Sequence, residues 1–198
     1  MSSSDTVSGA PLAFQPVYDE FFPKIRRYLT RVVGPTEAED LAQEVFAKVH
    51  QALPQFRRDS SVATWIYRIA TNAAYDRLRS PAFQRAREAP AVNEASVEDR
   101  TPGAEQTLVR REMNECIDGY IARLPARYRS ALILSEQEDL TNPQIAETLG
   151  VSVDTVKIRL HRARARLRKE LGSGCDFHRD DRNEFACAPR PRGVSVRD

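Results

Sequence analysis

The stretch LTNPQIAETLGVSVDTVKIRLHRAR, residues 140–164, carries the pattern of a helix-turn-helix. Thr141 and Gln144 have the spacing of a capping box for the first helix, and Gly150 supplies the backbone freedom of a tight turn. Ser152 stands where the second helix needs an N-cap. Apolar residues keep helical spacing, and we expect these to face inward: Ile145, Ala146, Leu149, Val153, Val156, Leu160, Ala163 and Leu167. Cap, turn and core thus agree in one register over 141–168.

The second of these helices is strongly basic beside its apolar stripe. Cations near its N-terminal end suit guanine edges in a major groove, and later arginines suit phosphates. We predict a surface for duplex DNA made by Ser152, Asp154, Thr155, Lys157, Arg159, Arg162 and Arg164. A merely solvated basic helix is the alternative, and the matching cap and turn argue against it. The role of Asp154 stays open between accepting from cytosine and favouring the helix N-terminus.

The whole 198-residue chain is predicted to be all-α, with two small helical domains. In the first domain, Thr36 and Glu39 form the capping box of a second helix, and Ser60 or Ser61 caps a third. We find no strand pattern in the sequence. The predicted organisation is a disordered N-terminus at 1–13, a first domain at 14–80, a flexible linker at 81–104, a second domain at 105–171 and a Cys- and His-containing tail at 172–198.

Composition excludes several classes of protein. The net charge is only +2, so a DNA partner has to be inferred from where the basic residues lie rather than from their total. We expect a cytoplasmic protein with no membrane partner, because the sequence has neither an 18-residue apolar run nor a secretory signal. We expect no enzyme and no required cofactor, because no phosphate-binding loop, zinc-protease motif or nucleophile with a base is recognised.

The tail holds Cys175, His178 and Cys187, three soft ligands with only one close Cys-x-x-His spacing. A candidate zinc site, a Cys175–Cys187 redox pair and an inert tail with incidental thiols all remain open. Cys116 is separate from them, since it lies on an apolar helical stripe and is expected to be a small core residue.

Three stretches carry a resemblance to a known family: DLAQEVFAKVHQALPQF (40–56), ATWIYRIATNAAYDRLR (63–79) and LPARYRSALILSEQEDLTNPQIAETLGVSVDTVKIRLHRARARLR (124–168). In this order and at these separations they resemble a bacterial RNA polymerase sigma factor of the sigma-70 family, extracytoplasmic-function (ECF) type. The resemblance implies that the two domains are sigma region 2 and sigma region 4. It also implies promoter-specific transcription initiation with core RNA polymerase, and in many members of the family an anti-sigma partner.

The resemblance also assigns surfaces in the first domain. Asp40, Gln43 and Glu44, on the outer face of an acidic helix, are expected to bind the β′ clamp of the polymerase. The opened minus-10 strand is expected to meet Arg57, Arg58, Arg68, Asn72, Arg77 and Arg79. Trp65 is either a core residue or a base-stacking residue. The helix-turn-helix is expected to bind the minus-35 element of promoter DNA.

Two positions depart from the family pattern. Asp139 stands near a turn where the family often has glycine, and Asp154 replaces a frequent glycine of the reading helix. The alternative to a sigma factor is a two-domain helix-turn-helix regulator that binds DNA without being a polymerase subunit. Such a regulator is expected to have a βαβ or ligand-binding N-terminal half, whereas residues 14–80 carry only helical patterns.

Overall fold

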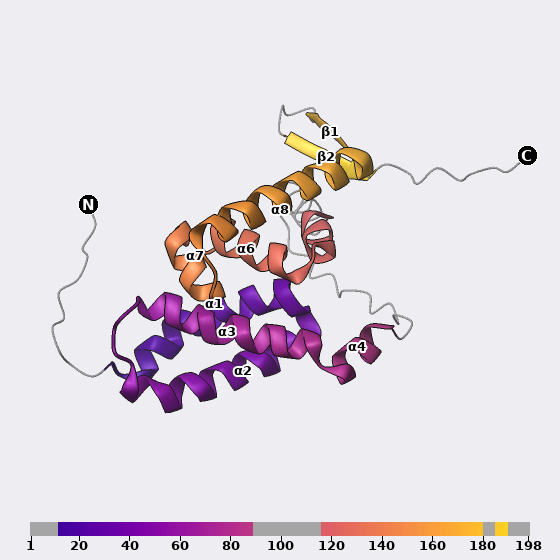
Figure 1. Cartoon of the computed structure of the whole chain (residues 1–198). Helices are drawn as coiled ribbons and strands as arrows, with labels where there is room; N and C mark the ends of the chain where they lie inside the picture. Colours follow the sequence, from indigo (N-terminus) through magenta and orange to yellow (C-terminus); the bar gives the residue numbers. More distant parts are fainter. Residues whose placement is uncertain (1–11, 89–115, 180–184, 190–198) are drawn as a thin grey trace, which may run out of the picture.

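Figure 1 shows the computed structural model of the chain, which describes residues 12–88, 116–179 and 185–189. Side chains are described for 12–85 and 116–175. Two groups of helices lie against each other, and a short β-hairpin follows the last helix (Figure 1). The prediction of two helical domains is confirmed. The predicted N-terminal segment falls almost wholly outside the described residues.

The N-terminal group is built from three long helices and a short 3-10 turn: α1 (Phe14–Val33), α2 (Pro35–Ala52), η1 (Leu53–Gln55) and α3 (Val62–Arg79). Gly34 alone joins α1 to α2, and its φ of 108° lies in the region that favours glycine. The helices share one apolar core, in which the hydroxyls of Tyr28 and Thr71 lie 2.8 Å apart. This hydrogen bond gives both buried oxygens a partner and ties α1 to α3.

The predicted capping box at Thr36 is wrong. α2 begins at Pro35, and its N-cap is Gly34, which has no side chain to accept a hydrogen bond. Proline suits the first helical position because no N–H is needed there and its φ is already helical. Glu39 lies 3.7 Å from Arg26 of α1 instead. The Ser61 cap of α3 is confirmed, because the Ser61 hydroxyl accepts from the N–H of Thr64 at 3.0 Å.

The segment predicted as a linker begins with a helix, α4 (Pro81–Glu88). The Ser80 hydroxyl accepts from the N–H of Phe83 at 3.2 Å, and Phe83 is buried against the N-terminal core. A serine cap and one aromatic anchor therefore extend this group beyond the predicted boundary at residue 80. Residues 89–104, the rest of the predicted linker, lie outside the described residues.

The C-terminal group is built around a buried central helix. It comprises a helix over 116–123, then α6 (Ala126–Glu136), α7 (Asn142–Leu149) and α8 (Val153–Gly174). Every residue of α6 from Tyr128 to Leu134 is buried. This helix packs against α7 and α8 within its own group and against α1 of the other.

The predicted local features of the helix-turn-helix are confirmed. The N–H of Thr141 donates to the Gln144 side chain at 2.8 Å, and that of Thr155 donates to the Ser152 hydroxyl at 3.2 Å. Gly150 is left-handed, with φ 62°. Asp139 adopts a similar conformation, with φ 51°, so the turn that the family often makes with glycine is kept here by an aspartate.

The tail departs from the prediction, since it contains two strands: β1 (Cys175–Arg179) and β2 (Phe185–Pro189). They pair antiparallel, with Cys175 opposite Pro189 and Phe177 opposite Cys187. Each strand has only five residues, β1 with two apolar positions and β2 with no polar position, and patterns this short are not recognised as strands from sequence. In the part of the chain that the structure describes, no helix is long and apolar enough to cross a membrane.

Candidate nucleic-acid interface

The outward side of α8 is the most basic helical surface of the C-terminal group. Val156, Leu160 and Ala163 are buried, whereas Lys157, Arg162 and Arg164 are exposed and Arg159 is half-buried. The buried residues confirm the predicted stripe. The basic side chains of α8 lie on either side of that stripe, so they point away from the protein core.

Ile158 lies at the centre of this outward side, although it is not among the DNA-binding residues predicted from the sequence. It is 51% exposed, and among the described side chains it is the one large hydrophobic residue that is exposed. At about 3.6 residues per turn it lies directly opposite the stripe of Val156, Leu160 and Ala163. A helical projection of the sequence could have revealed it, because an isoleucine at the outermost position of a reading helix suits the methyl group of thymine.

Several charges of α8 have partners within the protein. The Lys157 ammonium lies 3.3 Å from the Asp154 carboxylate, one helical turn away. Arg164 donates to Glu136 at 2.5 Å, and the Arg166 guanidinium lies 5.3 Å from the centre of the Tyr128 ring. Asp154 thus neutralises Lys157 in the free protein, in the first turn of the helix, where a carboxylate also favours the helix dipole.

The N-terminal group presents a second surface along α3. Trp65, Arg68 and Asn72 follow one another at spacings of three and four residues, so they share one side of the helix. Arg68 and Asn72 are exposed, and Trp65 is half-buried. The Trp65 ring contacts Phe56 of the preceding loop, with centroids 4.8 Å apart and planes tilted by 37°. Trp65 therefore packs on one side while remaining partly accessible.

The remaining minus-10 candidates have different surroundings. Arg57 and Arg58 are exposed in the loop before α3, and Arg58 has a φ of 60°. Arg79 pairs with Asp76 at 2.7 Å on the exposed end of α3. The structure brings Arg68 and Asn72 together, with the two loop arginines at the preceding end of the same helix and Arg79 at the other.

Arg77 differs from the other candidates because it is only 26% exposed and connects two helices. Its guanidinium donates to Glu44 at 2.7 Å and also to Glu37, both from α2. Partial burial lowers the pKa of Arg77, but the hydrogen bonds and charges of these carboxylates outweigh that effect and raise it. Arg77 therefore holds α3 against α2 in the free protein.

The acidic face of α2 is open to solvent. Asp40, Gln43 and Glu44 are all exposed, while Leu41, Ala42 and Val45 are buried beneath them. Of the three, Glu44 is also bound by Arg77. The predicted docking residues thus form one accessible patch, with Asp40 and Gln43 one turn apart.

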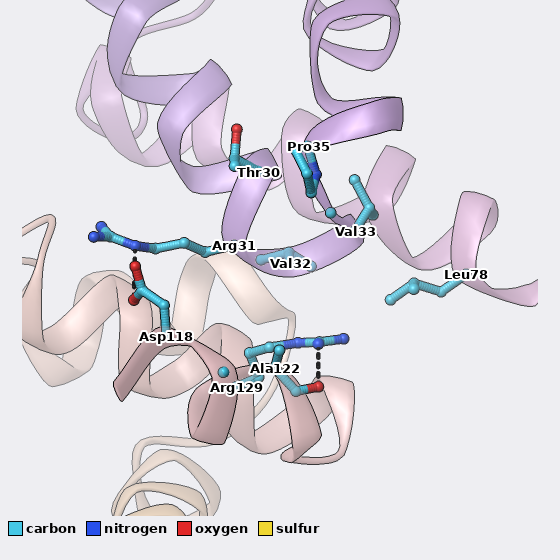
Figure 2. Close-up of a pocket in the computed structure, with 11 residues that line it drawn as sticks. Thr30, Arg31, Val32, Val33, Pro35, Leu78, Asp118, Ala122 and Arg129 are labelled. Atoms are coloured by element: carbon cyan, nitrogen blue, oxygen red, sulfur yellow. Dashed lines mark hydrogen bonds and ion pairs between the residues drawn. The ribbon is translucent and has the colours of Figure 1, made fainter. Parts of the chain in front are cut away.

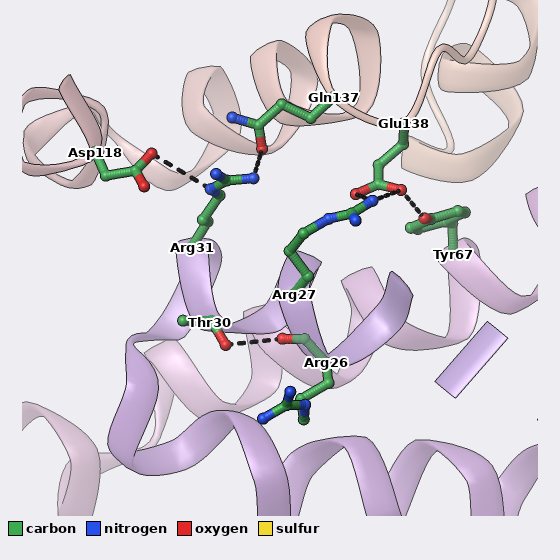
Figure 3. Close-up of polar contacts among 8 residues, drawn as sticks. All are labelled: Arg26, Arg27, Thr30, Arg31, Tyr67, Asp118, Gln137 and Glu138. Atoms are coloured by element: carbon green, nitrogen blue, oxygen red, sulfur yellow. Dashed lines mark hydrogen bonds and ion pairs between the residues drawn. The ribbon is translucent and has the colours of Figure 1, made fainter. Parts of the chain in front are cut away.

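A buried carboxylate joins the two helical groups. The side chain of Glu138, which is only 3% exposed, accepts from Arg27 of α1 at 3.1 and 3.2 Å through its two oxygens (Figure 3). It also accepts from the hydroxyl of Tyr67 in α3. Burial, then this hydrogen bond, raises the pKa of Tyr67. No local sequence signal marks Glu138, since its partners are 111 and 71 residues away.

Arg31 forms a second connection between the groups. It lies 3.3 Å from Asp118 and also donates to Gln137 (Figure 3). Beside it is a cavity of about 390 Å³ between the α1–α2 junction and the C-terminal helices, lined by Val33, Leu78 and Ala122 among others (Figure 2). The Arg129 guanidinium lies along this cavity and donates to the Ala122 carbonyl at 2.6 Å. The contact between the groups is therefore polar in part and incompletely filled.

The described side chains do not show the predicted metal ligands of the tail close to one another. Of the three, only Cys175 has a described side chain, and those of His178 and Cys187 lie outside the described ones. Within the described residues no group of three or more potential ligands surrounds a common point. The register places Cys175 opposite Pro189 rather than opposite Cys187.

Both helical groups match known sequence families. The family described as Sigma-70 region 2 matches residues 17–83, and the family described as Sigma-70, region 4 matches residues 114–167. Together the matches span both helical groups, and the first of them ends at Phe83, the aromatic anchor of α4.

Individual relatives agree with the family matches. The ECF RNA polymerase sigma factor SigW of Bacillus subtilis is 33% identical over 166 residues, which cover 80% of this chain and 89% of SigW. The ECF RNA polymerase sigma factor SigM of Mycobacterium tuberculosis is 34% identical over 160 residues, covering 78% and 77%. Among solved structures, the sigma factor RpoE of Bartonella quintana with the anti-sigma factor NepR has a TM-score of 0.62 at 22% identity, covering 80% of this chain and 96% of that one.

Proposed function

Because the chain belongs to the ECF sigma factors of bacterial RNA polymerase, we propose a division of its promoter and polymerase contacts among three helices, α8, α3 and α2. Sigma factors are transcription initiation factors that bind core polymerase and promoter DNA. Because the chain belongs to this family, the alternative of a helix-turn-helix regulator that acts without the polymerase no longer applies. We place the protein in the cytoplasm, where the polymerase works.

In this proposal α8 binds the minus-35 duplex. Thr155, Ile158, Arg159 and Arg162 stand at positions i, i+3, i+4 and i+7 of one side of the helix, and we assign them to base edges. Arg164 and the following arginines are assigned to phosphates, which add affinity without sequence information. Lys157 becomes available to DNA when its exposed ion pair with Asp154 breaks, at a cost that is small for a surface pair.

The minus-10 strand is assigned to the surface of Trp65, Arg68 and Asn72, with the loop arginines 57 and 58 beside it. An aromatic face and cations on one surface suit single-stranded DNA, because bases stack while phosphates are neutralised. Arg77 is removed from this set, since its two carboxylate partners give it a structural role in joining α3 to α2.

The polymerase contact is assigned to Asp40 and Gln43, with Glu44 at its margin. Their support is that they are exposed on the outer face of α2, together with an acidic character that suits a basic partner.

Binding both promoter elements at once requires the two helical groups to separate. The elements lie about 25 base pairs apart, or about 85 Å of B-DNA at a rise of about 3.4 Å per base pair. α8 itself, with 22 residues, is only about 33 Å long, and α7 packs directly against α3. We infer that the contacts of Glu138 and Arg31 hold a closed form that opens on the promoter.

The decisive experiment is initiation by purified core polymerase on a matching promoter, with and without this chain. We expect transcripts only with the chain. Loss of transcripts in Asp40→Ala, with duplex binding by α8 retained, supports the polymerase assignment. Normal initiation by the double variant Asp40→Ala, Gln43→Ala contradicts the polymerase assignment.

An anti-sigma protein is a further proposed partner. Its support is that the similar RpoE structure is a complex with an anti-sigma factor. Co-purification of this chain with a protein that blocks its initiation activity, and release of activity on removing that protein, is the corresponding test. Full activity of the chain at every stage of cell growth contradicts it.

A further inference from the structure

Two sulfur atoms lie close together at the far end of the C-terminal group. Cys116 is in the helix over 116–123, and Cys175 is the first residue after α8. Their Sγ atoms are 3.9 Å apart although the residues are 59 positions apart in the chain, and no disulfide joins them. From the sequence alone, Cys116 is expected to be a core residue, and the candidate partner of Cys175 is Cys187 in the tail.

The surroundings of this pair are closely fitted. The Cys175 thiol lies 3.7 Å from the hydroxyl of Tyr120, one turn after Cys116, and the hydrogen bond with Cys175 is the main cause that raises the pKa of Tyr120. A Cβ atom on Gly174 would lie 1.9 Å from the same hydroxyl. Only glycine at 174 therefore lets Tyr120 keep this position beside Cys175.

The two thiols differ in access to solvent. Cys175 is 1% exposed, whereas Cys116 is partly exposed. A small oxidant therefore reaches Cys116 first, and the buried thiol lies within van der Waals distance of the sulfur that has reacted. This is the arrangement of an attacking thiol with a resolving thiol.

We propose that Cys116 and Cys175 form a dithiol modification site that peroxide converts to a disulfide. The Cys116 thiolate attacks one peroxide oxygen, so that an S–O bond forms, the O–O bond breaks and water leaves after taking a proton. The Cys175 sulfur then attacks the sulfenic sulfur of Cys116. An S–S bond forms, the S–O bond breaks, and the hydroxyl leaves as a second water with the proton of Cys175. Two thiols lose two electrons, and one peroxide becomes two waters.

The required movement is small. The sulfur atoms must approach from 3.9 Å to about 2.05 Å, a change that side-chain rotation can provide. The bridge would enclose α6, α7 and α8 in one covalent loop, because it joins the helix before them to the residue after them. Oxidation is therefore expected to stabilise the helix-turn-helix against unfolding, as a cross-link over a long loop does.

The test uses the full chain, purified under reducing, oxygen-free conditions with its metal content measured. One equivalent of hydrogen peroxide is added, remaining thiols are counted, and non-reducing tryptic digests are analysed by mass spectrometry. Trypsin is expected to place the three cysteines in separate peptides, 112–123, 170–179 and 183–192, so each linkage has its own mass. We expect the loss of two thiols and the 112–123 to 170–179 link.

Matched variants decide between the alternatives. Cys187→Ser should keep the link and its rate, whereas Cys116→Ser should protect Cys175 from peroxide. Each variant is checked for helical content by circular dichroism. A Cys175–Cys187 link, bound zinc that protects the thiols, or three intact thiols after the equivalent of peroxide overturns the proposal. Gly174→Ala, which displaces the Tyr120 hydroxyl, should slow formation of the link while leaving the reactivity of Cys116 unchanged.

Discussion

α3 and α8, the two helices assigned to DNA, are supported by the protein in opposite ways. α3 packs against α1 and α2 in its own group and against α7 of the other, and its buried residues include Ile66, Tyr67 and Thr71. α8 buries one narrow stripe on α6 and α7 and leaves its other sides to solvent. α3, which we assign to the minus-10 strand, is therefore held by packing on several sides. α8, which we assign to the duplex, is held along one side and presents its charges to solvent.

The largest difference in stability is expected when the same change, isoleucine to alanine, is made in both helices. Ile66→Ala in α3 removes a fully buried side chain, and we expect it to lower the free energy of unfolding by about 2–5 kcal/mol. Ile158→Ala in α8 removes a half-exposed one and should change stability by less than about 0.5 kcal/mol. Urea denaturation followed by circular dichroism measures both. Similar losses in the two variants would show that α8 is also held by its outer side.

The next largest effect concerns the contact between the groups. Tyr67→Phe removes a hydrogen bond to the buried carboxylate of Glu138, and we expect it to weaken the closed form by about 1.5–3 kcal/mol. Energy transfer between labels at exposed Gln51 and Lys169 should fall.

Tyr75→Phe is the matched control for that variant. It lies on the same helix, and its buried hydroxyl has no hydrogen-bond partner among the described residues, so its removal should leave the energy transfer unchanged. An equal response of the two variants would argue against Glu138 as the residue that joins the groups.

A smaller effect separates the base contacts of α8 from its phosphate contacts. Arg159→Ala should cost about 1–3 kcal/mol on the preferred minus-35 sequence and much less on others. Arg168→Ala, an exposed change further along the helix, should weaken binding to every sequence alike and reduce the salt slope by about one. Fluorescence anisotropy with the preferred and scrambled duplexes at several salt concentrations measures both. Loss of binding by the same factor on every duplex would contradict a base contact by Arg159.

The smallest expected effect is that of Ile158 on thymine. Replacing each thymine of the minus-35 duplex in turn by deoxyuridine removes one methyl group. At the contacted position the wild-type chain should lose about 0.8 kcal/mol of binding free energy. Ile158→Ala should show no such loss at any position. A loss that persists in the variant would place the methyl contact on another residue.

Features that depend on neighbouring residues could be predicted from the sequence. The caps at Ser61, Thr141 and Ser152 and the turn at Gly150 follow from hydrogen bonds within a few residues, and all four are present. The local prediction failed at Thr36, where Pro35 offered a competing helix start directly after Gly34.

Features that join distant residues could not be predicted. In the sequence, Glu138 stands in an acidic segment that looks like any exposed turn. Only the packing of α1 and α3 against it makes its carboxylate a buried acceptor. Arg77 is one arginine among several in the sequence, and its difference lies in two carboxylates of another helix. Residue type was therefore enough to predict candidate binding residues. Which of these candidates already bind other side chains of the protein depends on tertiary packing.

The contact between Trp65 and Phe56 gives the protein a natural optical probe. Trp65 is the single tryptophan of the chain, so all indole fluorescence comes from this one site, where the first turn of α3 meets Phe56 of the preceding loop. An unpaired base that stacks on the indole should quench this emission, whereas oxidation of the distant sulfur pair should leave it unchanged. Strand capture can therefore be followed in real time, on the unlabelled wild-type chain, as a signal separate from every other event proposed for it.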